Sequence, residues 1–389
     1  MKKLIAFTAV FTLAGASAWA AAFTAGDLVI YRVGTGSGSL VNTGNAVFLD
    51  EYTPAGTLVQ SIAMPTTASG ANSALYASGT ATSEGMMTLS PNGQYLALTG
   101  YGSTSASSLS GTTGTAVNRV VGIVNASGAV DTSTVLTDFS SGNNPRSAVT
   151  DGTNIWVAGG AGGVRVTTLG STTSTQLSTT LTNLRDVSIQ GGQLYTSTSS
   201  GSAVRIGTVG TGTPTTSGQT IANLPGFATS GSPYQFAFAD LSSSVSGFDT
   251  LYVADDSASG GLIQKFSLVS GSWTASGTIT AAAVRGLTLS VDAGSGAVSL
   301  FGTTGGSSAT GGGSLYSFVD GTGYNGAVSG AVSTIATAAT NEAFRGVAFT
   351  PGTSVNTTFA AVPEPGVTAL LVAGLLGVGF MARRKFARE

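Results

Sequence analysis

The residues best suited to chemistry in this chain are arginines that recur at one position of a repeated segment. Each stands at the start of a short apolar run, and the four are Arg146, Arg185, Arg285 and Arg345. Two further segments carry Glu84 and Tyr234 near the same place. Guanidinium groups bind carboxylates and sulfates through paired hydrogen bonds. If the segments converge, the four arginines would form a cationic ring able to bind acidic sugars.

The same arginines also have a structural interpretation, which we favour from the sequence. Positions that recur in a repeat protein usually serve its architecture. Arg185 alternates with Val187 and Ile189, so in a strand all three side chains would share a face that packs on a neighbouring unit. The guanidinium groups would then cap backbone carbonyls or pair with carboxylates. The expected carboxylates are Asp138, Asp186 and Asp240.

The remaining composition removes several kinds of chemistry. The chain has no histidine and no cysteine, which excludes Ser-His catalysis and thiol chemistry. The adjacent acids Asp50-Glu51 and Asp255-Asp256 would point to opposite faces of a strand, so neither pair is a glycosidase dyad by itself. We therefore predict no catalytic residue, no metal and no cofactor. Calcium bound in the turns Asp151–Asn154 and Asp255–Ser257 is the alternative.

Short strands are the elements that must position these residues. No amphipathic helix is evident between Asp27 and about Thr350, and alternating segments are separated by Gly, Asn and Ser clusters. The expected inner segments are Gly85–Leu89, Arg146–Thr150, Arg185–Ile189, Tyr234–Ala239, Arg285–Leu289 and Arg345–Phe349. The first five are each followed by a second and a third strand and by a weaker fourth one, such as Gln176–Leu181 or Ser272–Thr280. Four antiparallel strands in each repeat predict a β-propeller.

The two ends of the body predict how the ring closes. The N-terminal strands Leu28–Val33, Val47–Tyr52 and Leu58–Ala63 lack a first strand, and Arg345–Phe349 lacks the other three. Joining them completes a blade and removes exposed sheet edges. We therefore predict an all-β propeller of six four-stranded blades. Seven blades and a Gly/Thr-rich β-helix are the alternatives. The segment Leu251–Asp255 with Gly260–Phe266 also resembles one repeat of NHL-type propellers.

The N-terminus has the features of a secretory signal peptide. Lys2 and Lys3 precede an apolar run that ends near Leu13, and Ala18 and Ala20 offer a small-x-small cleavage site. Charged residues are only 8% of the chain, and 57 glycines accompany abundant Ser and Thr, as in exported all-β proteins. The body between 21 and 362 carries more acidic than basic residues, so we expect no nucleic-acid partner.

The C-terminus carries an anchor-like segment behind a proline motif. Val362-Pro363-Glu364-Pro365 precedes an apolar run from Gly366 to Ala382, then Arg383, Arg384 and Lys385. A helix of this length is short for a bilayer, but flanking arginines can extend it by snorkelling. The basic end is expected to stay cytoplasmic. A plain C-terminal anchor is the alternative to a processed tail.

In order and spacing this tail resembles the PEP-CTERM sorting signal of Gram-negative bacteria. The resemblance covers 362–389 and implies recognition by an exosortase-type membrane enzyme after export through the secretion machinery. It further implies transient anchoring in the inner membrane, then delivery to the cell surface or extracellular matrix. Such proteins often accompany exopolysaccharide and biofilm genes, so a polysaccharide partner is implied as well.

These features predict four regions and a function. The regions are a signal peptide at 1–20, a propeller at 21–351, a linker at 352–361 and the sorting tail at 362–389, with its helix at 366–382. We predict a non-enzymatic surface or matrix protein involved in exopolysaccharide association. The alternative is a secreted propeller enzyme, a polysaccharide lyase or hydrolase. A lyase could rest on an Arg and a Tyr that meet in one cleft.

Overall fold

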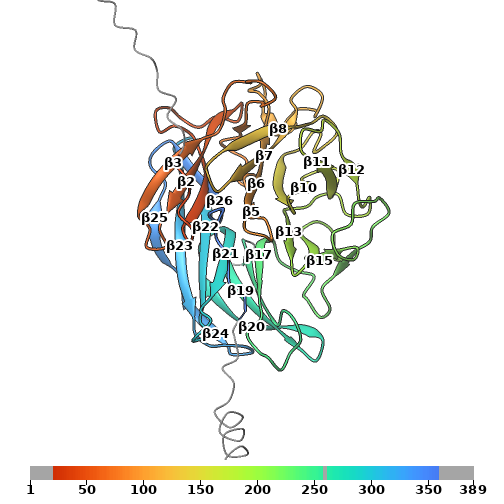
Figure 1. Cartoon of the computed structure of the whole chain (residues 1–389), viewed down its shortest axis with the longest axis vertical. Coiled ribbons are helices and arrows are strands. Elements are labelled where there is room, and N and C mark those ends of the chain that lie inside the picture. The colour runs from red at the N-terminus through yellow and green to blue at the C-terminus, as the bar shows by residue number, and fades with distance from the viewer. Residues whose placement is uncertain (1–20, 257–260, 359–389) are drawn as a thin grey trace, which may run out of the picture.

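The computed structural model describes residues 21–256 and 261–358, which form an all-β body (Figure 1). The helical structure in these two ranges is a single 3-10 turn, Leu109–Gly111. No helix there has the length and apolar character needed to cross a membrane. Several predictions fall outside the described residues. These are the cleavage site at Ala18 and Ala20, the motif Val362–Pro365, the helix at 366–382 and the basic residues Arg383, Arg384 and Lys385.

Strand pairing divides the body into six groups of four antiparallel strands, which we number as blades from the N-terminus, each read from the inner strand outward. Blade 1 is β26 (Glu342–Phe349), β1 (Leu28–Val33), β2 (Asn45–Tyr52) and β3 (Leu58–Ala63). Blade 2 is β5 (Thr88–Leu89), β6 (Tyr95–Tyr101), β7 (Arg119–Asn125) and β8 (Val130–Leu136). Blade 3 is β9 (Pro145–Thr150), β10 (Asn154–Gly159), β11 (Arg165–Thr168) and β12 (Thr175–Gln176).

The second half of the chain forms the other three blades. Blade 4 is β13 (Asp186–Gln190), β14 (Gln193–Ser197), β15 (Ile206–Val209) and β16 (Ile221–Asn223). Blade 5 is β17 (Pro233–Ala239), β18 (Thr250–Asp255), β19 (Leu262–Val269) and β20 (Ser272–Thr280). Blade 6 is β21 (Val284–Val291), β22 (Val298–Ser308), β23 (Gly311–Asp320) and β25 (Ser333–Thr337). The short strands β4 (Tyr76–Ala77) and β24 (Val328–Ala331) add to neighbouring blades.

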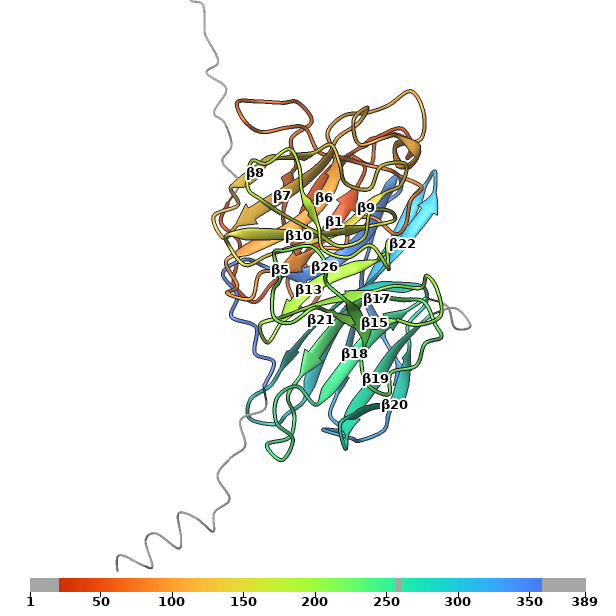
Figure 2. The ribbon, with the colours of Figure 1, turned by 90° about the vertical axis from the view of Figure 1, so that its right-hand side faces the viewer.

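The ring closes where the sequence predicts it. The C-terminal strand β26 pairs antiparallel with β1, with Leu28 opposite Phe349 and Val33 opposite Ala343. A salt bridge of 2.9 Å between Arg32 Nη1 and Glu342 Oε1 links the same two strands. The inner strands β5, β13, β17, β21 and β26 lie at the centre of the molecule in both Figure 1 and Figure 2. The all-β propeller prediction is therefore confirmed.

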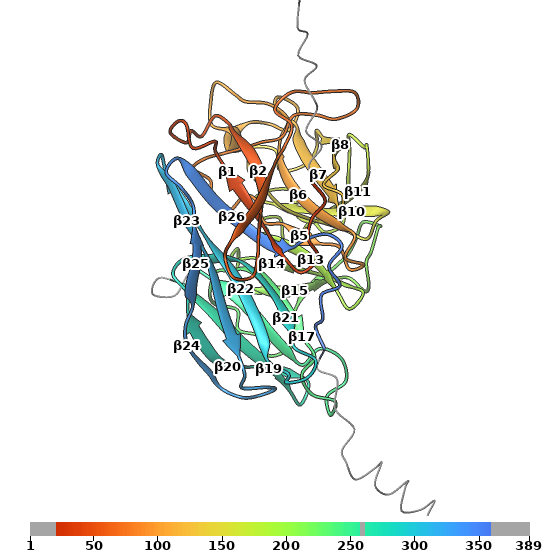
Figure 3. The same ribbon diagram turned by 60° about the vertical axis from the view of Figure 1, so that its left-hand side comes forward.

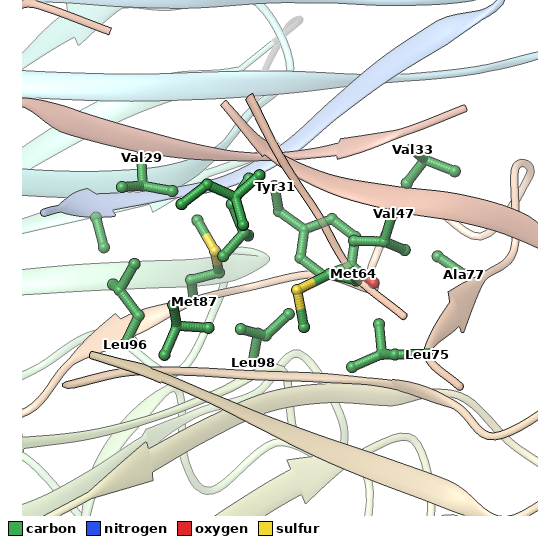
Figure 4. Packing of buried hydrophobic residues seen from close by; sticks show 14 of the residues in the cluster. Val29, Tyr31, Val33, Val47, Met64, Leu75, Ala77, Met87, Leu96 and Leu98 are labelled. Carbon is green, nitrogen blue, oxygen red and sulfur yellow. The ribbon is translucent and has the colours of Figure 1, made fainter. Parts of the chain in front are cut away.

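One apolar cluster fills each of the six seams between neighbouring blades. The alternation of β1 shows how a strand serves two seams. Val29 and Tyr31 pack toward blade 2, where Figure 4 shows them with Met87, Leu96 and Leu98. Leu28 and Ile30, on the opposite face, pack toward blade 6. A strand with both faces buried needs mostly apolar residues, which explains the nearly continuous apolar run of β1.

Some outer strands are shorter than the sequence predicts. The expected fourth strand at Gln176–Leu181 is reduced to the two residues of β12, Thr175–Gln176. Gln176 Nε2 donates to the carbonyl of Ser178, which lies outside the sheet. A polar side chain thus satisfies the backbone locally here and competes with strand pairing. The fourth strand of blade 5, in contrast, spans Ser272–Thr280 as expected.

The chain beyond β26 crosses the end of the propeller at which the inner strands finish, which we call the lower end. We call Thr350–Thr358 the strap; it follows β26 along one side of the molecule (Figure 3). Gly352 N donates to Gly93 O of blade 2 at 2.7 Å. Gly93 has φ +69 and no room for a Cβ, which would stand 2.3 Å from Thr353 O. Residues 352–358 of the predicted linker are therefore bound to the propeller.

Further along, the strap reaches two more blades. Val291 N of blade 6 donates to Asn356 O, and Asn356 Nδ2 donates back to Val291 O, both at 2.7 Å. Asp240 N, just after β17 of blade 5, donates to Thr357 O at 2.8 Å. The strap thus ties blades 2, 6 and 5 together across the channel.

Candidate functional site

The inner strands bring the recurring polar residues to one end of the channel, which we call the mouth. A blade of four antiparallel strands returns the chain to the end where it started, so all inner strands begin at the same end. Glu84 and Arg185 stand just before β5 and β13, and Arg146, Tyr234, Arg285 and Arg345 lie in the first half of their strands. The predicted convergence of these segments is what the structure shows.

Four side chains at the mouth form the cluster that we consider the candidate site: Arg185, Tyr234, Asp256 and Arg285. The Tyr234 ring lies between two guanidinium groups, whose carbons are 4.0 Å (Arg185) and 4.8 Å (Arg285) from its centroid. Asp256 Oδ2 accepts hydrogen bonds from Nε of Arg285 at 2.9 Å and pairs with its Nη2 at 2.8 Å. Asp256 Oδ1 is 3.9 Å from Nη1 of Arg185.

Asp256 is the member of this cluster whose role sequence reasoning missed. We expected the arginines to pair with Asp138, Asp186 or Asp240. Instead Asp138 pairs with Arg165 at 2.9 Å, and Asp186 accepts a hydrogen bond from Ser147 Oγ. Asp256 directly follows β18, so it reaches the mouth from the second strand of its blade. The sequence signal for this role was the position of Asp256 just after the strand Leu251–Asp255. The second strand of a blade ends beside the start of the inner strand, because the two are antiparallel.

Two donors of the cluster remain open. Nη1 of Arg185 and Nη1 of Arg285 are both buried, and neither makes a hydrogen bond within the described part of the chain. A buried charged N–H without an acceptor carries a substantial desolvation cost. Ser199 Oγ holds Arg185 from the other side, accepting from Nε at 3.1 Å and from Nη2 at 2.8 Å. The cluster is therefore fixed in place but still able to bind an anionic oxygen.

Burial decides the protonation state of Tyr234. The side chain is 3% exposed, and this burial is the main cause of a raised pKa for its phenol. The nearby Arg185 and Arg285 act in the opposite direction but do not cancel the effect. Tyr234 is consequently a neutral phenol at neutral pH. It can donate a proton, but it is a poor candidate for a base.

Arg146 borders the cluster and extends its positive charge. Its Nη1 donates to Asn183 Oδ1 at 2.7 Å and to Leu184 O at 2.8 Å. Burial, and then the charge of Arg185, lower the pKa of Arg146 to about 10. The group therefore remains protonated at neutral pH. Three of the four predicted ring arginines lie around this part of the mouth.

Arg345 has a different environment from the other three. It is 1% exposed, and its guanidinium donates to the carbonyls of Gly79, Phe344 and Gly306. Burial lowers its pKa to about 10, which the neighbouring Glu84 partly offsets. Glu84 is also buried; it accepts from the Tyr101 hydroxyl at 2.6 Å, and burial raises its pKa to about 7. The carbonyl-capping role that the sequence suggested fits Arg345.

A side chain crosses the channel below the mouth. Gln235 Nε2 donates to Met87 O of blade 2 at 2.7 Å, and Gln235 Oε1 accepts from Leu287 N of blade 6 at 3.2 Å. Gln235 follows Tyr234 directly, so it lies at the base of the cluster. This bridge connects blade 5 with blade 2 across the ring and with the neighbouring blade 6, and it divides the channel into two parts.

The lower part of the channel is a cavity of about 410 Å³. It extends from the level of Gln235 to the strap, which contributes Thr353 and Val355 to its wall. Its polar side chains are largely bonded to one another. Gln190, for example, donates to Ser188 Oγ and Phe236 O and accepts from Phe238 N. Asp186 lies in the same wall, and burial raises its pKa to about 7.

The other acids singled out from the sequence have local partners. Asp50 pairs with Arg32, and Glu51 accepts from Thr24 N at 2.6 Å. Asp151 Oδ1 accepts from two backbone N–H groups of its own turn, those of Thr153 and Asn154. Within residues 21–256 and 261–358, no three acidic side chains gather in a way that could hold a metal ion. Calcium stays an untested alternative.

Comparisons with known proteins place the chain among propellers without giving it a family. No protein-family model matches, and no curated protein matches. Solved structures that resemble it include a protein assigned as a candidate 6-phosphogluconolactonase from Bacteroides uniformis, with 15% identity, 80% and 82% of the two chains covered, and a TM-score of 0.44. The periplasmic gluconolactonase of Pseudomonas aeruginosa has 12% identity, 80% and 83% coverage, and a TM-score of 0.40. TolB from Acinetobacter baumannii has 10% identity, 84% and 67% coverage, and a TM-score of 0.43.

These similarities correct one prediction. The sequence led us to predict a protein without enzymatic activity, but a gluconolactonase and a candidate lactonase are among the similar propellers. We therefore withdraw the non-enzymatic interpretation. At such low identity the comparisons assign no residue and no substrate. The chemistry has to be argued from the mouth itself.

Proposed function

We propose that this protein is an exported propeller hydrolase that cleaves the ester or lactone carbonyl of a sugar acid at the mouth. The observation that carries the proposal is the packing of Tyr234 between Arg185 and Arg285, with Asp256 bonded to the same arginines. This set contains a positively charged oxygen-binding site, a proton donor and a carboxylate within one cluster. A polysaccharide is also the partner that the resemblance of the tail implies.

The cluster suits carbonyl hydrolysis better than the two other reactions considered from the sequence. Glycoside hydrolysis uses two carboxyl groups that face each other across the scissile bond. The second acid near the mouth, Glu84, has both carboxylate oxygens bonded within the chain, one to the Tyr101 hydroxyl and the other to Ser78 N, so it is not available as the second carboxyl group. Elimination needs a base beside the sugar C5, and the raised pKa of Tyr234 makes it a poor one.

The proposed reaction assigns one role to each side chain. Asp256 Oδ1, the oxygen that Arg285 leaves open, takes a proton from water as the water oxygen attacks the carbonyl carbon. The oxyanion that forms accepts hydrogen bonds from Nη1 of Arg185 and Nη1 of Arg285. The bond to the leaving oxygen then breaks as the Tyr234 hydroxyl donates its proton. The proton held by Asp256 returns to Tyr234 through solvent, which completes the cycle.

A substrate panel tests this proposal. The chain is incubated with δ-lactones of sugar acids and with methyl esters of uronic acids, and acid release is followed at constant pH. We expect turnover of at least one substrate, lowered by about 10²-fold in Tyr234→Phe and in Asp256→Asn. If Asp256→Asn loses activity but Tyr234→Phe keeps it, Tyr234 has no role in the reaction. An unsaturated uronate product, seen by its ultraviolet absorbance, would instead indicate a lyase.

We also propose that the signal peptide and the PEP-CTERM-like tail deliver this enzyme to the cell surface. Lys2 to Ala20 support export, and Val362–Pro365 with the basic residues after 382 support exosortase-type processing. Mass spectrometry of the exported protein tests both steps. We expect an N-terminus after Ala20 or Ala22 and a C-terminus near Pro363–Pro365. An exported protein that keeps residues 366–389 would contradict the processing step.

A further inference from the structure

A second hollow opens beside the mouth, on the side of blade 5 that faces blade 4. It has a volume of about 310 Å³ and lies between the chain that enters β17 and the outer strands β19 and β20. We call it the crevice. The residues of its wall that matter here are Phe227, Pro233, Asp255, Gln264, Phe266 and Ala275.

The crevice is lined by residues that directly precede two members of the Arg–Tyr–Asp cluster. Pro233 and Asp255 line it, and the residues that follow each of them, Tyr234 and Asp256, belong to the cluster. Pro233 and Asp255 are also register partners across β17 and β18. Consecutive Cα atoms are about 3.8 Å apart. The crevice and the cluster are therefore neighbours at the same strand ends.

The chemistry of the crevice differs from that of the mouth. The rings of Phe227 and Phe266 pack at 4.4 Å between centroids and give it an apolar floor. Asp255 uses both carboxylate oxygens to accept from Ser232 N, and no cation lines the described wall. Gln264 is half-buried, and its amide makes no hydrogen bond to another described residue. An apolar floor with a free amide suits a ligand that has flat apolar faces and hydroxyl edges, without charge.

We infer that the crevice is a subsite for an uncharged sugar unit adjoining the unit that reacts at the cluster. The substrate is then an oligosaccharide or polysaccharide carrying esterified uronate units, rather than a single sugar acid. This inference rests on the proposed function, because the cluster must be the reacting site. It adds a requirement for chain length, which the cluster alone does not impose.

A substitution that fills the crevice tests the inference. Ala275 is exposed and lines the crevice, so Ala275→Trp fills it from the rim without disturbing the core. Thr274→Trp is the control, since Thr274 is equally exposed on the same strand but does not line the crevice. The substrates are galacturonic acid methyl ester and the trimethyl ester of trigalacturonic acid, whose neighbouring units are uncharged.

The parent and Thr274→Trp should prefer the trisaccharide by about tenfold in kcat/KM, mainly through KM. Ala275→Trp should lose that preference while it hydrolyses the monosaccharide at the parent rate. Gln264→Ala should give a smaller loss in the same direction. Equal preference in parent and Ala275→Trp, or no preference in the parent, would overturn the inference.

Failure of the proposed function has a different signature. If no protein turns over either ester, binding of the trisaccharide is measured by titration calorimetry. Heat of binding in the parent and in Thr274→Trp, lost in Ala275→Trp, would still support the crevice. Absence of binding in the parent, or binding that Ala275→Trp leaves unchanged, would overturn it.

Discussion

The two ends of the central channel contain similar polar residues but differ in how those residues are bonded. At the mouth, two buried arginine nitrogens have no acceptor in the described chain, and Asp256 Oδ1 stays open. In the lower cavity, Gln190 is bonded at both ends of its amide, and the strap covers the opening. The polar side chains of the lower cavity are thus the more saturated. Unsatisfied guanidinium donors distinguish the candidate site from that cavity.

Removal of the closing strand should have the largest effect on both ends. A chain that ends before Arg345 loses the part of β26 that pairs with Leu28–Ile30, so this part of β1 becomes an open sheet edge. We expect it to aggregate, whereas a chain that ends after Ala361 should stay soluble and monomeric. Size-exclusion chromatography of the two chains checks this. Similar behaviour of both chains would show that ring closure is unimportant for folding.

Loss of the bridge between the two ends should lower stability strongly. Gln235 is 4% exposed, and Gln235→Ala removes two buried hydrogen bonds and leaves Met87 O and Leu287 N unpaired. We expect the free energy of unfolding to fall by about 2–4 kcal/mol. Urea denaturation measures it, with the exposed Gln94→Ala as the control. If Gln235→Ala unfolds at the same urea concentration as the control, the channel is not bridged in solution.

The pH dependence of stability should reveal the titration of Asp186, the buried acid in the wall of the lower cavity. Burial raises the pKa of Asp186 to about 7, well above the ordinary value of an aspartate, so the folded state binds the proton more tightly than the unfolded state. Its contribution to stability is therefore complete below the unfolded value and is lost as the pH rises toward 7. The free energy of unfolding of Asp186→Asn should rise by a few kcal/mol relative to that of the parent as the pH goes from 4 to 8.

Glu84 has a pKa of about 7 for the same reason and titrates in the same window, so Glu84→Gln is the matched comparison. Urea denaturation at both pH values checks the two variants. A constant stability difference between parent and Asp186→Asn across this range would contradict the burial of Asp186.

The strap should contribute the smallest effect. The exposed side chain of Asn356 donates from Nδ2 to Val291 O at 2.7 Å and accepts at Oδ1 from Thr358 N at 3.3 Å. Asn356→Ala should lower the free energy of unfolding by about 1 kcal/mol. Amide exchange of Val291 should become faster, because its N–H donates to the strap. Unchanged protection at Val291 would mean that the strap is not held through this contact.

The fold was largely predictable from the sequence. The repeated apolar segments and the unmatched strands at the two ends predicted the closing pair of β26 with β1, because pairing removes sheet edges. The fourth strands were harder to predict. In the segment after Thr175 the Gln176 side chain bonds the local backbone, and strand propensity alone overestimates the length of the strand.

The candidate site was predictable only in part. The recurrence of arginines located the mouth, because equivalent positions in a ring of repeats meet at one end. The separation of Arg345 from the other three was not predictable, since it depends on the carbonyls of Gly79 and Gly306 in remote segments. The role of Asp256 was also missed, because it depends on two neighbouring blades that contribute Arg185 and Arg285.

The most direct test of the account is the hydrolysis rate of the Arg185→Ala/Arg285→Ala double variant. Arg165→Ala is the control, since Arg165, on the third strand of blade 3, pairs with Asp138 and with no member of the cluster. We expect the double variant to lose about 10²–10³-fold or more in kcat, because both oxyanion donors are gone, and the control to keep the parent rate. Equal kcat in the double variant and the control would contradict the assignment of the mouth as the reacting site.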